Sequence, residues 1–297
     1  MSSPHEFVLT LSCRDTTGIV YAVSGLLYQA GCNILDSQQF GDVGSADSTG
    51  LFFMRMHFQA PDHLAGPTAP AALDTLFAHA RTQFGMDAQI HSLARKPRLL
   101  LMVSKFGHCL NDLMFRWQSG QLNVAVAGIV SNHPDFAELA AGYGVPFHHL
   151  PLAAGASAQA KRAQERQVEA LVEREQVDLV VLARYMQILS ADFCAFLKGR
   201  AINIHHSFLP SFKGAKPYYQ AHGRGVKLIG ATAHYVTAEL DEGPIIEQDV
   251  ARVDHSLSPD DLTAVGRDVE SVVLARAVRW HVEHRVLLNG HKTVVFS

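Results

Sequence analysis

The sequence lacks most features of secreted and membrane-bound chains. It has only four cysteines in 297 residues, widely separated and without a Cys-x-x-Cys pair, so we expect neither a disulfide framework nor a cysteine metal site. No apolar run is long enough to cross a membrane. The first residues, MSSPHEF, lack the basic start and apolar core of a signal peptide. These absences predict a cytoplasmic protein with reduced thiols and no membrane association.

Several binding motifs are also missing, and each absence argues against a class of protein. The sequence has no dinucleotide fingerprint, no Walker A loop and no Gly-x-Ser-x-Gly elbow. Its 17 histidines include adjacent pairs but no His-Glu-x-x-His motif, and neighbours on a strand face opposite ways. A net charge of −3 gives no reason to expect nucleic acid binding. We therefore expect no metal, no cofactor and no nucleic acid partner.

The charge is unevenly divided along the chain. Residues 1–94 contain three arginines, no lysine and eight acidic residues, a net charge of −5, which leaves +2 for the remainder. The stretch ARKPR, residues 94–98, lies at this change and has the composition of a linker. We expect two domains, residues 1–94 and 95–297, which a chain of this length allows.

Residues 1–94 predict four strands and two helices in the order βαββαβ, the ferredoxin-like pattern. Thr16 or Thr17 is expected to cap the first helix, and Gly31 to end it. The expected strands are 6–13, 33–40, 50–58 and 87–93, and the expected helices are 18–30 and 71–84.

Residues 95–297 alternate strands with helices, which predicts a doubly wound α/β domain with a mostly parallel sheet. Continuous apolar runs such as RLLLMVS and DLVVLA are typical of strands buried on both faces. The expected strands are 98–104, 123–131, 145–150, 178–183, 200–205, 227–237, 243–253 and 291–296. The expected helices are 106–119, one beginning at Pro134, 158–176, 190–197 and 258–288.

The stretch AINIHHSFLPSFKGAKP, residues 201–217, carries the candidate chemistry. Asn203 and His205 are expected on one face of the strand and His206 on the other. An amide donor beside a proton-exchanging imidazole suits reactions at a carbonyl group. Six cations and no acidic residue lie between Lys198 and Lys227, which favours an anionic substrate.

The first domain resembles the ACT family of amino-acid-sensing modules. The matching residues are CRDTTGI at 13–19 and GCNI at 31–34. The resemblance implies an effector site, for glycine or methionine, lined by Asp15, Gly18 and Asn33, and a homo-oligomer formed through this domain. A purely local role remains open, since Gly18 can serve close backbone packing and Asp15 can cap the helix.

Three segments of the second domain together resemble the folate-dependent formyl transferase family: INIH with Leu209-Pro210, then HYVT at 234–237, then LDEGPII at 240–246. The resemblance implies a catalytic Asn203, His205 and Asp241. Asn203 and His205 would stabilise the oxyanion formed at a formyl group, and Asp241 would orient His205 and a water molecule. It also implies folate-binding residues in LARYMQIL at 182–189 and after 235: Arg184, Met186, Gln187, Leu189, Val236, Glu239 and Leu240.

Members of this family differ in the residues that bind the second substrate. Transferases that formylate glycinamide ribonucleotide have a Gly-Ser-Asn turn for its phosphate, whereas this sequence has Gly107, His108 and Cys109. His108 could fill the altered site or serve a structural role. Together with the ACT-like segment, this resembles the formyltetrahydrofolate deformylases, which implies hydrolysis of 10-formyltetrahydrofolate and release of formate for one-carbon and purine metabolism. A formyl transferase acting on an amine, and a catalytically silent folate or amino-acid sensor, remain the alternatives.

Overall fold

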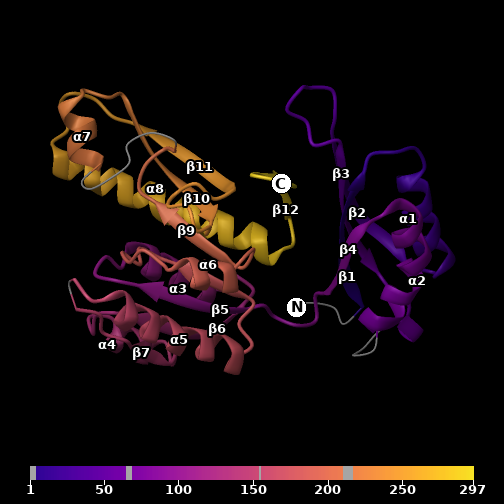
Figure 1. The fold of residues 1–297 in the computed structure, drawn as a ribbon, viewed down its shortest axis with the longest axis horizontal. Coiled ribbons are helices and arrows are strands. Elements are labelled where there is room, and N and C mark those ends of the chain that lie inside the picture. Colours follow the sequence, from indigo (N-terminus) through magenta and orange to yellow (C-terminus); the bar gives the residue numbers. More distant parts are fainter. Residues whose placement is uncertain (1–4, 65–68, 154, 210–216) are drawn as a thin grey trace. The chain divides into compact units, whose positions relative to one another are not determined.

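The computed structural model describes residues 5–64, 69–153, 155–209 and 217–297. The chain forms two compact units, one containing the described residues up to Lys96 together with Glu283–Ser297, the other Pro97–Val282 (Figure 1). The sequence placed the last residues in the second domain, whereas the structure groups them with the first unit. Buried Arg55 holds them there, because its guanidinium donates to the carbonyl oxygens of Glu283 and His284 at 3.1 and 3.2 Å.

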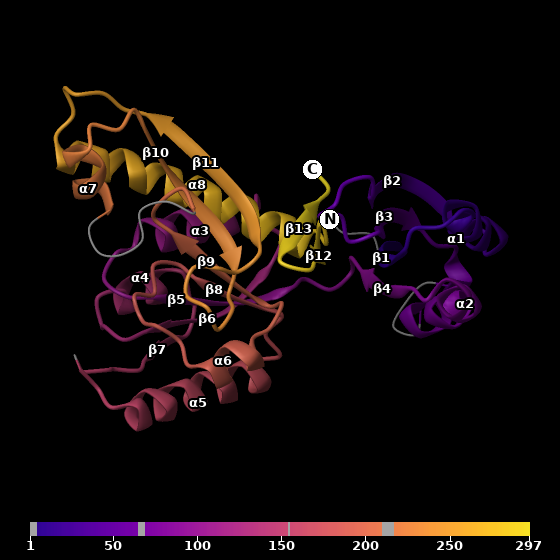
Figure 2. The same cartoon turned by 45° about the horizontal axis from the view of Figure 1, so that its top comes forward.

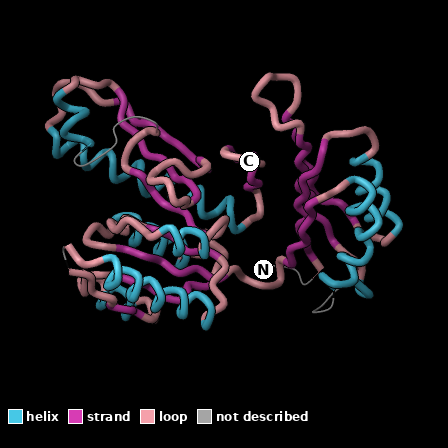
Figure 3. Tube along the Cα trace, in the orientation of Figure 1, coloured by secondary structure: helices cyan, strands magenta, loops and turns pink. Residues whose placement is uncertain are grey.

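The first unit has the predicted βαββαβ order. Its four antiparallel strands lie in the order β2-β3-β1-β4, and both helices cover one face of the sheet (Figure 3). The elements are β1 (Glu6–Arg14), α1 (Ile19–Gln29), β2 (Asn33–Asp42), β3 (Leu51–Gln59), α2 (Ala69–Phe84) and β4 (Asp87–Ser92), with a short 3-10 helix at Asp62–Leu64. The ferredoxin-like fold predicted from the sequence is confirmed.

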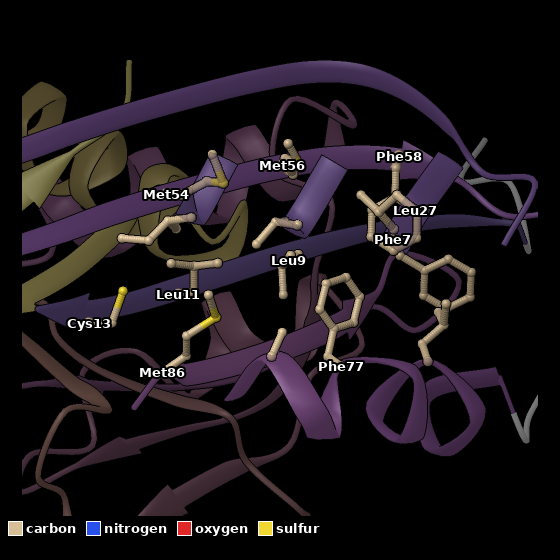
Figure 4. Close-up of a cluster of buried hydrophobic side chains, with 14 of the residues drawn as sticks. Phe7, Leu9, Leu11, Cys13, Leu27, Met54, Met56, Phe58, Phe77 and Met86 are labelled. Atoms are coloured by element: carbon tan, nitrogen blue, oxygen red, sulfur yellow. The ribbon is translucent and has the colours of Figure 1, made fainter. Parts of the chain in front are cut away.

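The core of this unit follows from the alternation of side chains along β1. Phe7, Leu9 and Leu11 are 0–1% exposed and point to the helix-covered face, where Leu27 of α1 and Phe77 of α2 complete the cluster (Figure 4). Burying a side chain of this kind contributes about 1.5–3 kcal/mol. The period of two in β1 therefore fixes which face of the sheet carries the helices.

Helix α1 differs from the sequence prediction at its start but not at its end. Its N-cap is Gly18 in a left-handed conformation (φ 98°), with no side-chain cap, so the predicted capping by Thr16 or Thr17 is wrong. Gly31, with φ 74°, ends the helix as predicted, and the N–H groups of Gly31 and Cys32 bond to the carbonyls of Tyr28 and Leu27.

The second unit is a seven-stranded sheet in the order β11-β10-β9-β8-β5-β6-β7 (Figure 2). Pairings from β9 to β7 are parallel, and β10 and β11 add antiparallel strands at one edge. Helices α5 and α6 cover one face, and α3 and α8 the other (Figure 2). The strands are β5 (Arg98–Val103), β6 (Ala125–Ser131), β7 (Phe147–His149), β8 (Leu179–Leu182), β9 (Ala201–His205), β10 (Leu228–Tyr235) and β11 (Ile245–Arg252). The doubly wound, mostly parallel sheet is confirmed.

The helices of this unit depart from the prediction at several ends. They are α3 (His108–Gln118), α4 (Ala137–Gly142), α5 (Ala158–Arg174), α6 (Ala191–Phe196), α7 (Pro217–Gly223) and α8 (Pro259–Val282). Helix α7 was not predicted, and α4 begins at Ala137 after an N-cap at Phe136, not at Pro134. Helix α8 stops six residues before the predicted Leu288, because His284 adopts a left-handed φ of 54°. Strands β12 (Val286–Asn289) and β13 (Lys292–Val295) follow as an antiparallel pair.

Just before β11, the backbone at Gly243 passes very close to the backbone of Tyr235. A Cβ atom at this position would lie 1.7 Å from the Tyr235 carbonyl oxygen, in a segment where the Tyr235 N–H bonds to the Pro244 carbonyl at 2.9 Å. We expect Gly243→Ala to lower the free energy of unfolding by about 3 kcal/mol, measured by urea denaturation. Gly142→Ala is the matched control, since nothing lies within 4 Å of its Cβ position, and it should be neutral or slightly stabilising.

Candidate active site

A cavity of about 600 Å³ lies in the second unit at the carboxyl ends of β8 and β9. This is where ligands bind in open α/β sheets. All ten residues that the sequence assigned to catalysis and folate binding line it: Asn203, His205, Asp241, Arg184, Met186, Gln187, Leu189, Val236, Glu239 and Leu240. Met186, Ile188 and Leu240 are 52–62% exposed, an apolar surface of the kind that a bound ligand covers.

The fold brings the three predicted catalytic side chains together. His205, the last residue of β9, donates from Nδ1 to Asp241 Oδ2 at 3.1 Å, and both side chains are largely buried. Among the described residues, its Nε2 atom has no hydrogen-bond partner although it is buried. An unpaired buried imidazole nitrogen that lines a cavity is available to a substrate.

Asp241 is held in an uncommon backbone conformation, with φ at 58°. Aspartate tolerates this left-handed region better than most residues. Burial acts to raise the pKa of its carboxyl group, but the hydrogen bond and charge of His205 outweigh burial, and the pKa lies well below its usual range. Asp241 is therefore a carboxylate at neutral pH.

His234 is a site residue to which the sequence analysis gave no role. It faces Asn203 across the antiparallel β9–β10 pair, is 3% exposed, and its Nε2 lies 3.2 Å from Asn203 Nδ2. Its Nδ1 lies 2.9 Å from the Tyr235 carbonyl and must donate there, which leaves Nε2 to accept from the Asn203 amide. This contact orients Asn203 and leaves its second amide hydrogen for a ligand. In the sequence, His234 could have been found as the first residue of the HYVT segment at 234–237.

Hydrogen bonds to polar side chains outside the loop fix the backbone around residues 184–190. The Met186 N–H donates to Ser104 Oγ at 3.0 Å, and Ser104 Oγ donates to Asn132 Oδ1 at 2.7 Å. Buried Glu165 accepts from the Ser190 N–H at 2.7 Å. Arg184 itself has a left-handed φ of 66°, a strained conformation for an arginine that is typical of functional sites.

The sequence prediction for His206 is wrong. Strand β9 ends at His205, so side-chain alternation does not extend to His206, and both imidazoles line the cavity with ring centroids 5.1 Å apart. Burial, with smaller contributions from the nearby Arg184 and His205 charges, lowers the pKa of His206 to about 4.

The buried, neutral His206 makes the stability of the protein depend on pH. Since its folded pKa of about 4 lies below the unfolded value of 6.5, the unfolded chain binds the additional proton between these values. We expect the free energy of unfolding to decrease by on the order of 2 kcal/mol from this group as the pH falls from 6.5 to 4. The measurement is the difference between wild type and His206→Gln in urea titrations at both pH values. Parallel pH profiles would contradict the expectation.

A second polar cluster lines the cavity near His206. Glu270 of α8 is 1% exposed and accepts from Tyr218 Oη at 2.7 Å and from His108 Nε2 at 2.8 Å, while Arg184 Nε lies 3.4 Å away. His108, Cys109 and Glu270 have ligand atoms within 4.8 Å of one another. Burial raises the pKa of the Cys109 thiol, however, and His108 and Glu270 already bond to each other, so a hydrogen bond accounts for these contacts.

Among the described residues, the cations between residues 198 and 227 do not line the cavity as the sequence suggested. Lys213 and Lys216 lie outside the described residues, as does Pro210 of the Leu209-Pro210 pair. The other four, Lys198, Arg200, Arg224 and Lys227, are not among the described residues that line the cavity. Its arginines are instead Arg184 and Arg267.

The three candidate effector residues are divided between two ends of the first unit. Asp15 and Gly18 follow the Arg14 end of β1, whereas Asn33 lies level with Glu6 through its register with Gln59. These ends are about 26 Å apart at ~3.3 Å per residue. Within one copy, the structure does not bring Asn33 together with the other two residues.

None of the helices in the described part of the chain has the length and apolar character needed to span a bilayer.

Comparison with known proteins gives the family of this chain. Residues 97–278 match the formyl transferase family. The chain is 49% identical over 99% of its length to a formyltetrahydrofolate deformylase of Corynebacterium sp. (strain P-1), covering 99% of that protein. A crystal structure of the deformylase from Burkholderia mallei ATCC 23344 superposes with a TM-score of 0.90 at 54% identity, covering 99% of this chain and 100% of the other.

The amine-formylating enzymes are more distant. Glycinamide ribonucleotide transformylase 1 from Symbiobacterium toebii has a TM-score of 0.63 and 30% identity, and the match covers 68% of this chain and 95% of that one. The likeness to the deformylases instead extends through both units of the fold. The chain belongs to the formyltetrahydrofolate deformylase family.

Proposed function

We propose that this protein hydrolyses 10-formyltetrahydrofolate to formate and tetrahydrofolate. The observation that carries the proposal is the convergence of Asn203, His205 and Asp241 on one cavity, where His205 Nε2 is buried and has no hydrogen-bond partner in the described part of the chain. The near-full-length likeness to deformylases supports water as the acceptor. The reaction as written consumes only the folate and water.

The roles of the three residues follow from their positions. Attack of water on the formyl carbon forms a tetrahedral oxyanion, to which the free Asn203 amide hydrogen and His205 Nε2–H donate. The Asp241 carboxylate holds the His205 ring through Nδ1 and stabilises the imidazolium. Because Asp241 is ionised at neutral pH, it can also accept a hydrogen bond from the attacking water.

The proton balance requires one transfer to the leaving nitrogen. The water oxygen forms a bond to the formyl carbon, the bond from that carbon to N10 breaks, and N10 gains a proton as tetrahydrofolate leaves. The formyl group departs as formate with release of a proton. Each well-placed acid–base group typically contributes about 10²–10⁴-fold to such a reaction.

The folate would occupy the wall formed by residues 182–189 and 236–241. Met186, Leu189 and Leu240 offer apolar contacts to a flat ring system, and Gln187 and Glu239 offer polar atoms at its edge. The backbone of the first segment is already fixed through Ser104. This wall therefore needs little reordering when the ligand binds.

Acceptor-free turnover tests the proposal directly. Purified protein incubated with 10-formyltetrahydrofolate alone should release stoichiometric formate and tetrahydrofolate. The amine-transferase alternative predicts no formate until glycinamide ribonucleotide is added, and that result would overturn hydrolysis.

The first unit, on this proposal, senses an amino acid and joins copies of the chain. Its ACT-like segments support this role, and a site that contains Asp15, Gly18 and Asn33 together needs two copies. Titrating glycine and methionine against formate release, with sedimentation to give the oligomeric state, tests both parts. A monomer whose activity ignores both amino acids would refute them. The cytoplasmic location expected from the separated cysteines stays a prediction.

A further inference from the structure

The cluster around Glu270 lies beside the catalytic centre and has no role in the mechanism above. Its members come from four separate parts of the second unit: His108 from α3, Tyr218 from α7, Glu270 from α8 and Arg184 from the segment after β8. The His206 ring links it to the centre, with centroids 5.1 Å from His205 and 6.3 Å from Tyr218. All of these residues line the same cavity as His205.

The residues of the cluster stabilise the negative charge of the Glu270 carboxylate. Burial acts to raise the pKa of Glu270, but the hydrogen bond from His108, the Arg184 charge and the Tyr218 hydroxyl outweigh burial and lower it. Burial also raises the pKa of Tyr218, which keeps this hydroxyl protonated as a donor. The Tyr218 ring packs against Gly266, one turn before Glu270, where a Cβ would lie 2.2 Å from the ring. The site therefore holds a fixed carboxylate with its donors in place.

An amine acceptor has to bring its nitrogen to the formyl carbon beside His205. On the side reached through His206, the cavity is lined by the Arg184 and Tyr218 side chains, and a phosphorylated amine that displaced them would meet the buried Glu270 carboxylate. Displacing Tyr218 would break its buried hydrogen bond to the charged Glu270 carboxylate, worth about 1.5–3 kcal/mol. Water needs none of this space and carries no charge.

We propose that His108, Arg184, Tyr218 and Glu270 form an acceptor-excluding cluster, which determines specificity by opposing the entry of an amine with fixed side chains and a buried carboxylate, and so leaves water as the acceptor. This inference rests on the proposed hydrolytic function. Removing the cluster should let an amine nitrogen attack the formyl carbon, the carbon–N10 bond break, and the amine proton pass to N10.

The test is the ratio of products, which does not depend on how fast a variant turns over. Arg184→Gly suits the left-handed backbone at this position, and we combine it with His108→Ala. With 10-formyltetrahydrofolate and excess glycinamide, wild type should release formate alone. The double variant should also form N-formylglycinamide, at a ratio to formate at least tenfold above wild type. Arg276→Ala, an exposed arginine paired with Asp249, is the control and should match wild type.

A second measurement needs no turnover. Glu270→Gln removes the fixed charge and leaves Arg184 and His108 to attract an anion, so inorganic phosphate should raise its melting temperature more than that of wild type. Equal phosphate shifts, together with an unchanged product ratio in an active double variant, would overturn the inference. If the double variant is inactive, equal phosphate shifts alone overturn it. Failure of hydrolysis itself shows separately, as absence of formate from wild type.

Discussion

His205→Ala should lower kcat for formate release about 10³–10⁴-fold. The variant loses the buried Nε2 atom, which lines the cavity and has no hydrogen-bond partner among the residues that the structure describes. On the proposed mechanism, this removes both an oxyanion donor and a proton carrier. On the proposed function, ground-state binding of the folate would rest mainly on the wall formed by residues 182–189 and 236–241. The dissociation constant for tetrahydrofolate should therefore change much less than kcat, as measured by equilibrium titration alongside the rate.

Two controls make this result interpretable. His255→Ala removes an exposed imidazole from the same unit and should retain wild-type kcat. The melting temperature of His205→Ala separates a chemical loss from unfolding. If wild type and His205→Ala bind folate equally and neither turns it over, the protein is a silent sensor. A fully active His205→Ala would rule out the catalytic role of this residue.

Asp241→Asn should lower kcat about 10²–10³-fold. The side chain keeps its shape, and asparagine also tolerates a φ of 58°, so the fold should be retained. What is lost is the charge that orients the His205 ring at 3.1 Å and stabilises the imidazolium. The amide can also turn its NH₂ group toward Nδ1, which favours the wrong tautomer. Steady-state kinetics with near-ultraviolet circular dichroism as the folding check measure this effect.

The neighbouring carboxylate provides the matched control for Asp241. Glu242 is exposed and adjacent in sequence, and Glu242→Gln should stay within a factor of a few of wild type. Because the pKa of Asp241 lies well below its usual range, the wild-type rate should not titrate with this group between pH 5 and 9. Equal losses in both variants would show that the charge of the loop, and not the geometry of Asp241, supports activity.

Much of the fold was predictable because it follows from local chemistry. The alternation in β1 and the glycine at position 31 each act within a few residues, and the structure has the strand and the helix end that they predict. Errors arose where a longer-range or backbone effect decided. The start of α1 is set by a left-handed Gly18, and the tail after Val282 is fixed by Arg55, which lies 228 residues from Glu283 in the sequence.

In the cavity, too, local sequence patterns identified some residues, whereas others depended on longer-range contacts. Asn203, His205 and Asp241 could be named from motifs, since each motif carries its residue types in a fixed spacing. The amide–imidazole contact of Asn203 with His234 requires the register of β9 against β10, which no local pattern gives. His206 was misplaced because strand alternation was extended one residue beyond the end of the strand.

The sequence by itself determined the two folds, the family and the chemical groups available for catalysis, because strand periodicity and motif spacing are properties of neighbouring residues. Only the tertiary structure decided that Glu270, 162 residues beyond His108, stands beside that histidine and next to the reaction centre. The physical reason is that burial of a charge depends on partners from separate elements, and only the packed sheet and helices bring those partners within hydrogen-bond distance.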